Sequence, residues 1–105
     1  MNEHNRGNSE LLECVLIAKQ IETMEISWQI GCAEIARRTL AGRVSPNEIC
    51  TLLSEISVSL DSPDDLSIFE LIAHEQYGHE GLGITAASCI PDIMSECERL
   101  ASHGV

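Results

Sequence analysis

Two short segments in the middle of the chain constrain its fold more than any other feature, because each one spells the start of an α-helix. They read Ser45-Pro46-Asn47-Glu48 and Ser62-Pro63-Asp64-Asp65. In each, the serine hydroxyl can accept a hydrogen bond from a free N–H of the first turn, and the proline fits the first helical position. The acidic residue three positions after the serine suits a capping box and the positive end of the helix dipole. The pattern predicts helices over 46–60 and 63–77, joined tightly enough to form a central helical hairpin.

Apolar residues at helical spacing before this hairpin predict a first helix that runs from a cap at Asn8 or Ser9 to Gly42. They form two neighbouring rows, so the helix is expected to be apolar over more than one face. The second row consists of Leu12, Leu16, Ile26, Ile30 and Ala33. A glycine in a helix interior costs only about 1 kcal/mol, so a break near Ser27–Gly31 is permitted but not required. We expect one long or bent helix, with a break at that position as the alternative.

The remaining segments complete an all-α protein. Three glycines over 78–83 predict a loose loop, after which Thr85 opens a last helix that Pro91 either kinks or begins. Residues 1–8 are polar and are expected to form a disordered tail. Residues 9–105 are expected to fold as one domain, a small helical bundle of four or five helices with a long first helix.

The charge of the chain is acidic and unevenly placed. From position 44 to position 98 there is no Lys or Arg, against eleven Asp and Glu, and the formal net charge is −11. Such a surface repels phosphate backbones, which argues against direct nucleic-acid binding. It attracts a basic protein partner, although acidity that only maintains solubility is the alternative. No apolar run reaches the length of a membrane span and no signal-like segment opens the chain, so we expect a soluble, cytoplasmic protein without a membrane partner.

The chain has five cysteines, an odd number, and no Cys-x-x-Cys pair. This pattern fits neither a secreted disulfide framework nor a zinc site. The cysteines stand among apolar neighbours in the sequence, which predicts buried, reduced thiols that act as small hydrophobic side chains. They are Cys14, Cys32, Cys50, Cys89 and Cys97.

One cluster resembles a catalytic or metal-binding motif, the segment His74-Glu75-Gln76-Tyr77-Gly78-His79-Glu80. A zincin needs two histidines four residues apart on one helix face, and here the second is one residue late, about 140° round the helix. The aspartates at 61, 64 and 65 miss the alternating ligands of an EF-hand loop, and helix capping accounts for them. A Cys–His catalytic pair stays open, because such partners meet in space rather than in sequence. We expect no metal, no cofactor and no enzymatic activity.

The same region is a candidate surface for binding a protein partner. A tyrosine at a helix end among acidic side chains is typical of an interface anchor, because the ring supplies affinity and the acids attract a basic surface. The candidate partner-binding residues are Asp61, Asp64, Asp65, Glu70, His74, Glu75, Tyr77, His79 and Glu80, with no Lys or Arg between them in the sequence. Trp28, in contrast, lies on an apolar row and is expected in the core.

Small, acidic, all-helical domains with a tyrosine at a helix end are typical of bacteriocin and toxin immunity proteins. This chain resembles them in size, in charge and in the segment Asp65-Leu66-Ser67-Ile68-Phe69-Glu70. It lacks the tandem Tyr-Tyr and the closing Trp-Arg of the colicin nuclease inhibitors. The resemblance implies a non-enzymatic protein that binds and masks a basic toxin through acidic helices.

Two other classes of protein stay open. One is a dimeric helical adaptor or secretion chaperone, in which residues within 12–35 of the apolar first helix would form a homodimer interface. The other is an acidic inhibitor that mimics nucleic acid. A monomer at every concentration would favour an immunity-type protein over the adaptor.

Overall fold

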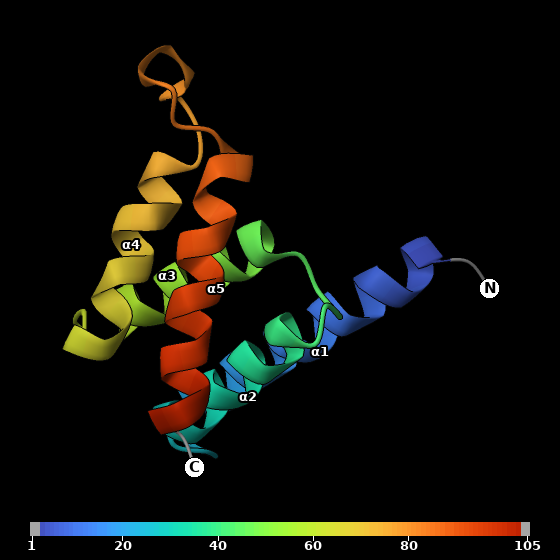
Figure 1. Ribbon diagram of the computed structural model, residues 1–105. Helices are drawn as coiled ribbons and strands as arrows, with labels where there is room; N and C mark the ends of the chain where they lie inside the picture. The colour runs from blue at the N-terminus through green and yellow to red at the C-terminus, as the bar shows by residue number, and fades with distance from the viewer. Residues whose placement is uncertain (1–2, 104–105) are drawn as a thin grey trace.

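The computed structural model describes the backbone of residues 3–103 and the side chains of residues 9–102. Over this range the chain forms five α-helices and one short 3-10 helix (Figure 1). The elements are α1 (Glu3–Glu22), α2 (Trp28–Leu40), α3 (Pro46–Ser59), α4 (Asp64–Glu75), η1 (Glu80–Leu82) and α5 (Ala86–His103). The described backbone contains no β-strand, so the predicted all-α bundle is confirmed. No helix within residues 3–103 is both long and apolar enough to cross a bilayer.

Two helix pairs build the bundle. α3 packs mainly against α4, and α2 packs mainly against α5. α4 and α5 stand side by side, α3 crosses behind them, and α1 and α2 run together to one side of this pair (Figure 1). The segment that holds η1 projects beyond the ends of α4 and α5 at the top of the view. α1 contacts the bundle through α2 and α3, so one of its faces is left for solvent.

The expectation of one long first helix is wrong, and the alternative of a break near Ser27–Gly31 is the one observed, because a turn that ends at Ser27 separates α1 from α2. Within this turn Met24 has a left-handed backbone with a φ of 64°, which interrupts a right-handed helix. Ser27 then caps α2 by accepting a hydrogen bond at 3.3 Å from the N–H three residues on. Gly31 lies inside α2, where a Cβ would stand 2.6 Å from Cδ1 of Ile21. The glycine thus permits the close approach of α1 to α2, while the break itself precedes it.

The first helix also begins earlier than predicted. α1 starts at Glu3 rather than at Asn8 or Ser9, so the backbone of residues 3–8 is helical. Met1 and Asn2, the rest of the expected tail, lie outside the described residues.

Ion pairs fasten α1 to α2. The Arg38 guanidinium donates from Nη1 to Oε1 of Glu13 at 2.7 Å and from Nε to Oε2 of Glu34 at 2.9 Å. Arg43 donates from Nη2 to Oε1 of Glu10 at 2.7 Å. Hydrogen bonding by Arg38 lowers the pKa of Glu13 and that of Glu34 from the ordinary value of 4.5. The network thereby adds charged hydrogen bonds to the apolar packing between the two helices.

Neither of the two predicted helix starts in the middle of the chain has the capping hydrogen bond that its motif predicts. Ser45 is the N-cap of α3 with extended backbone, but its side chain makes no capping hydrogen bond. Val44 and Ile49 are both buried, at the two positions of a hydrophobic staple, so apolar contacts support this start. In the second motif Ser62 has a left-handed φ of 54°, and Pro63 is the N-cap of α4. Ser62 is therefore not the cap, and α4 begins one residue later than predicted.

α3 and α4 form an antiparallel hairpin, and buried polar groups hold it closed. Near the start of α3, Asn47 Nδ2 donates to Oε1 of Gln76 at 2.6 Å and to the carbonyl oxygen of Ala86 at 2.8 Å. Farther along α3, the Ser57 hydroxyl donates to the Glu70 carboxylate. Ser57 is buried, and this bond satisfies its hydroxyl. These bonds also position the start of α5 beside the hairpin.

The core lies where the helix pairs meet and consists of aliphatic side chains around one aromatic ring. Its largest fully buried apolar side chains are Phe69, Ile35, Ile49, Leu53, Leu66 and Ile93. Trp28 is half-buried and packs against this core, in agreement with its apolar row.

All five cysteines are buried and unpaired, which confirms the prediction of reduced thiols within the apolar interior. Burial raises the pKa of Cys32, of Cys50 and of Cys97 to about 12. The neutral thiol is therefore the stable form at neutral pH, and these groups serve as core side chains rather than as nucleophiles.

Candidate binding site

The segment after α4 presents Tyr77 to solvent. Tyr77 is 61% exposed, and Gly78 follows it with a φ of 85°, a left-handed backbone that turns the chain sharply. The Gly78 N–H donates to Oε1 of Glu80 at 3.4 Å, and Nδ1 of His79 lies 3.0 Å from the Tyr77 carbonyl oxygen. The exposed ring is thus carried by a turn with its own hydrogen bonds rather than by the middle of a helix.

Two histidines flank this turn. The rings of His74 and His79 meet edge to face, with centroids 5.0 Å apart and an interplanar angle of 68°. Their contact shows that the one-residue offset from a zincin motif still brings the imidazoles together. Among the described side chains, no three His, Cys, Asp or Glu residues converge on a point that could hold a metal ion. The two histidines stand on either side of Tyr77 in the sequence, and His79 and Glu80 contact the backbone of its turn.

Tyr77 also borders a hollow between α1 and α3. The hollow has a volume of about 280 Å³, and its floor is apolar. It is lined by Leu11, Val15, Glu48, Thr51, Leu52, Glu55 and Tyr77. Glu48 and Glu55 were not among the residues predicted for the site. Their spacing carries a signal, because Glu48, Leu52 and Glu55 recur every three or four residues and so share one face of α3.

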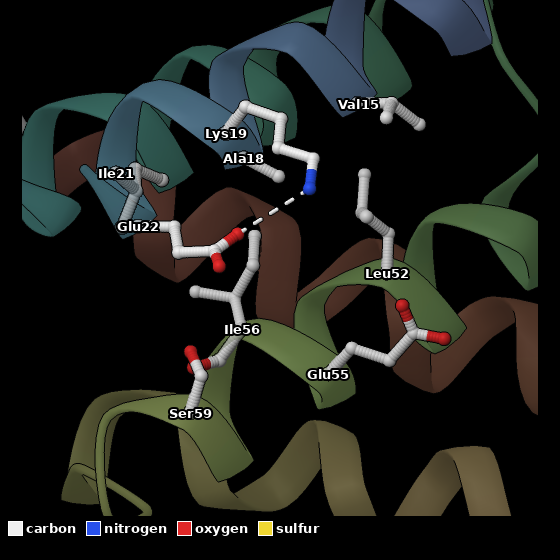
Figure 2. Close-up of a pocket in the computed structure, with 9 residues that line it drawn as sticks. All are labelled: Val15, Ala18, Lys19, Ile21, Glu22, Leu52, Glu55, Ile56 and Ser59. Carbon is white, nitrogen blue, oxygen red and sulfur yellow. Dashed lines mark hydrogen bonds and ion pairs between the residues drawn. The ribbon is translucent and has the colours of Figure 1, made fainter.

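A second hollow continues the first along the same two helices. Figure 2 shows Leu52 and Ile56 of α3 directed toward Val15 and Ala18 of α1. This hollow has a volume of about 260 Å³ and shares Val15, Leu52 and Glu55 with the first. Together they form what we term the α1–α3 groove, lined by Leu11, Val15, Ala18, Lys19, Ile21, Glu22, Glu48, Thr51, Leu52, Glu55, Ile56, Ser59 and Tyr77. Tyr77 stands at one end of it.

The rim of the groove is mainly acidic. Lys19 Nζ lies 3.7 Å from Oε2 of Glu22 across one edge, as Figure 2 shows. Glu48 and Glu55 form no ion pair with any side chain in the described range 9–102. Two carboxylates on α3 thus stand above a floor of aliphatic side chains without a cation from residues 9–102 beside them.

The remaining predicted residues do not gather at Tyr77. Asp61 and Asp64 are exposed at the opposite end of α4, which is about 18 Å long at 1.5 Å per residue. Asp65 was expected to have no cation near it, and this is wrong: Oδ1 lies 3.3 Å from Nη1 of Arg99 on α5. Glu70 turns toward α3, where hydrogen bonds from Ser57 and then Ser62 lower its pKa from 4.5. The nine predicted residues therefore divide into five at or near Tyr77 in the sequence, three at the other end of α4, and Glu70, which faces α3.

Comparison with known proteins finds no family model, no curated sequence and no solved structure that matches this chain. The site is therefore described by its own geometry, an exposed tyrosine at the end of an apolar groove with carboxylates on its rim.

Proposed function

We propose that this is a non-enzymatic, acidic helical protein that binds and masks a basic protein, as a toxin-immunity or inhibitor protein does. The observation that carries the proposal is the exposed ring of Tyr77 beside Glu48 and Glu55, whose carboxylates form no ion pair with the side chains of residues 9–102. A tyrosine left in solvent at the end of an apolar hollow has ring area to bury against another surface.

The two kinds of group have different parts in binding. Tyrosine is enriched among the few residues that supply most of the affinity of an interface, because its ring is large and loses little rotamer entropy. Carboxylates supply little net affinity when exposed, but they steer a basic surface and disfavour acidic ones. With a net charge of −11, this chain attracts basic proteins before contact.

The predicted residues take graded roles under this proposal. Tyr77 is the anchor, and His74, Glu75, His79 and Glu80 surround it as a polar rim. Asp61 and Asp64 act at longer range through their charge, because they lie at the far end of α4. Asp65 and Glu70 contribute less to the external field, since Arg99 and Ser57 already engage their carboxylates.

A second candidate is a homodimeric helical adaptor that uses residues within 12–35. The observation in its favour is the exposure of Leu12, Leu16 and Ile30 at 64%, 63% and 57%. Leu12 and Leu16 lie on α1 and Ile30 lies on α2, and apolar side chains left in solvent are typical of an interface with another chain. A dimer mass in light scattering, lost on Leu16→Glu, would support the adaptor.

The masking function is tested by affinity capture from the native host. The immobilised baits are wild type, Tyr77→Ala, the double variant Glu48→Lys/Glu55→Lys, and Leu71→Ala as the control. Leu71 is a matched control because it is a large, exposed apolar side chain on α4 outside the groove. We expect wild type and Leu71→Ala to retain the same basic protein and the other two to lose it. Equal recovery by all four baits, or an acidic captured protein, would contradict the proposal.

A further inference from the structure

The α1–α3 groove is long enough for a helical segment. On α3 its lining recurs at Glu48, Leu52, Glu55 and Ser59, a single row along one face. From the first to the last of these the helix rises about 16 Å, which is three turns of an α-helix. The facing row on α1 runs from Leu11 to Glu22 over the same length.

The floor and the rim of the groove differ in chemistry. Leu11, Val15, Leu52 and Ile56 provide an aliphatic floor. Ile56 is buried, Leu11 and Leu52 are partly buried against the core, and Val15 is exposed. An aliphatic floor with a defined direction suits an amphipathic helix, whose apolar side chains recur at i, i+4 and i+7.

The charge of the rim selects among possible occupants. Three glutamates and one lysine border the groove, and two of these glutamates have no cation beside them in the described structure. A second copy of this chain would bring further acids, because its net charge is also −11. Lysine and arginine flanks on the occupant would instead pair with Glu48 and Glu55.

We propose that the α1–α3 groove binds an amphipathic α-helix of the partner, about three turns long, with apolar residues on the floor and Lys or Arg along the Glu48–Glu55 rim. The basic character of the partner rests on the proposed function. The groove adds the form of the bound segment, an α-helix. Tyr77 closes one end of the groove, so the bound helix abuts the anchor.

Synthetic peptides test this groove directly, without the natural partner. The probe is a fluorescein-labelled helix of about fourteen residues, with Leu at i, i+4 and i+7 and Lys elsewhere. Two controls are a scrambled peptide of the same composition and a peptide with Glu in place of Lys. Fluorescence anisotropy should give wild type an affinity for the probe at least about tenfold above that for either control.

Three variants of the full chain locate the binding. Val15→Lys places a cation on the groove floor and should weaken probe binding about tenfold or more. Val58→Lys is the matched control, since Val58 is an exposed valine on α3 outside the groove, and it should bind as wild type does. Glu55→Lys should weaken binding of the Lys probe and strengthen binding of the Glu peptide, a reversal that misfolding cannot produce.

Several results would overturn the groove proposal. They are no binding of the probe by wild type, equal binding of all three peptides, unchanged binding by Val15→Lys, or a wild-type homodimer whose interface covers the groove. If Val15→Lys still captures the basic host protein while Tyr77→Ala does not, the groove assignment fails and the masking function stands. If neither change affects capture, the masking function fails as well.

Discussion

Thr85 and Ser88 satisfy each other's backbone at the start of α5. The Ser88 N–H donates to Oγ1 of Thr85 at 3.0 Å, and the Thr85 N–H donates to Oγ of Ser88 at 2.8 Å. This is a reciprocal capping arrangement that satisfies two otherwise free donors of the first turn. Pro91 lies farther along the same helix without ending it, so α5 owes its start to this cap.

The starts of α5 and α3 therefore differ in how much their capping residues contribute to stability. Thr85→Ala should lower the free energy of unfolding by about 1 kcal/mol, because it removes the Oγ1 that accepts the hydrogen bond from the Ser88 N–H. Ser45→Ala should change stability by well under that amount, since Ser45 makes no capping bond. Urea denaturation of both variants measures the difference. A larger loss for Ser45→Ala than for Thr85→Ala would contradict the hydrogen bonding described here.

At the scale of elements, the attachment of α1 to α2 depends on ionised carboxylates. The pKa values of Glu13 and Glu34 are lowered in the folded protein, chiefly by hydrogen bonds from Arg38. A carboxyl group whose pKa is lower in the folded state stabilises the fold above its unfolded pKa. That contribution is lost as the pH falls below the ordinary value of 4.5 and through the lowered folded value.

Arg38→Met should remove this pH dependence while keeping the apolar stem of the side chain. The difference in unfolding free energy between wild type and Arg38→Met should be constant at neutral pH and shrink below about pH 4.5. Lys19→Met is the control, because the exposed Lys19–Glu22 pair contributes little. Thermal unfolding at several pH values provides the measurement. A difference that grows as the pH falls would show that the network does not stabilise the fold.

The sequence predicts helix boundaries well where local signals agree. It predicts them poorly where a contact between two helices determines the boundary. The helices after Ser45, Pro63 and Thr85 are marked by prolines, caps and apolar spacing, and all three form near the predicted positions. The break after α1 is marked only by Ser27 and Gly31, which permit it without requiring it, because a left-handed Met24 and the contact of Gly31 with Ile21 depend on how α1 folds back. A hydrophobic pattern of period 3.6 continues through the turn and therefore predicts one continuous helix.

At the scale of the whole molecule, the proposed function gives the charge and the groove separate parts. In that proposal the acidic field speeds the approach of a basic protein, and Tyr77 and the groove hold it once bound. The tyrosine could be predicted from the sequence, because it follows a helix among acids. Glu48 and Glu55 could not, since only the folding of α3 beside α1 and against α4 places them next to Tyr77. The ion pair of Asp65 could not be predicted either, because its partner Arg99 is distant in the sequence and lies beside it only through the packing of α5 against α4.

Binding kinetics with the captured partner test this division of roles most directly. Wild type, Tyr77→Ala, Asp64→Lys and the control Leu71→Ala are compared by surface plasmon resonance over a range of salt concentrations. Tyr77→Ala should raise the dissociation rate about tenfold or more with little change in the association rate. Asp64→Lys should slow association at low salt, with the difference from wild type vanishing as salt screens the charge. Unchanged dissociation for Tyr77→Ala, together with association rates that do not depend on salt, would contradict the account of an acidic protein anchored through its exposed tyrosine.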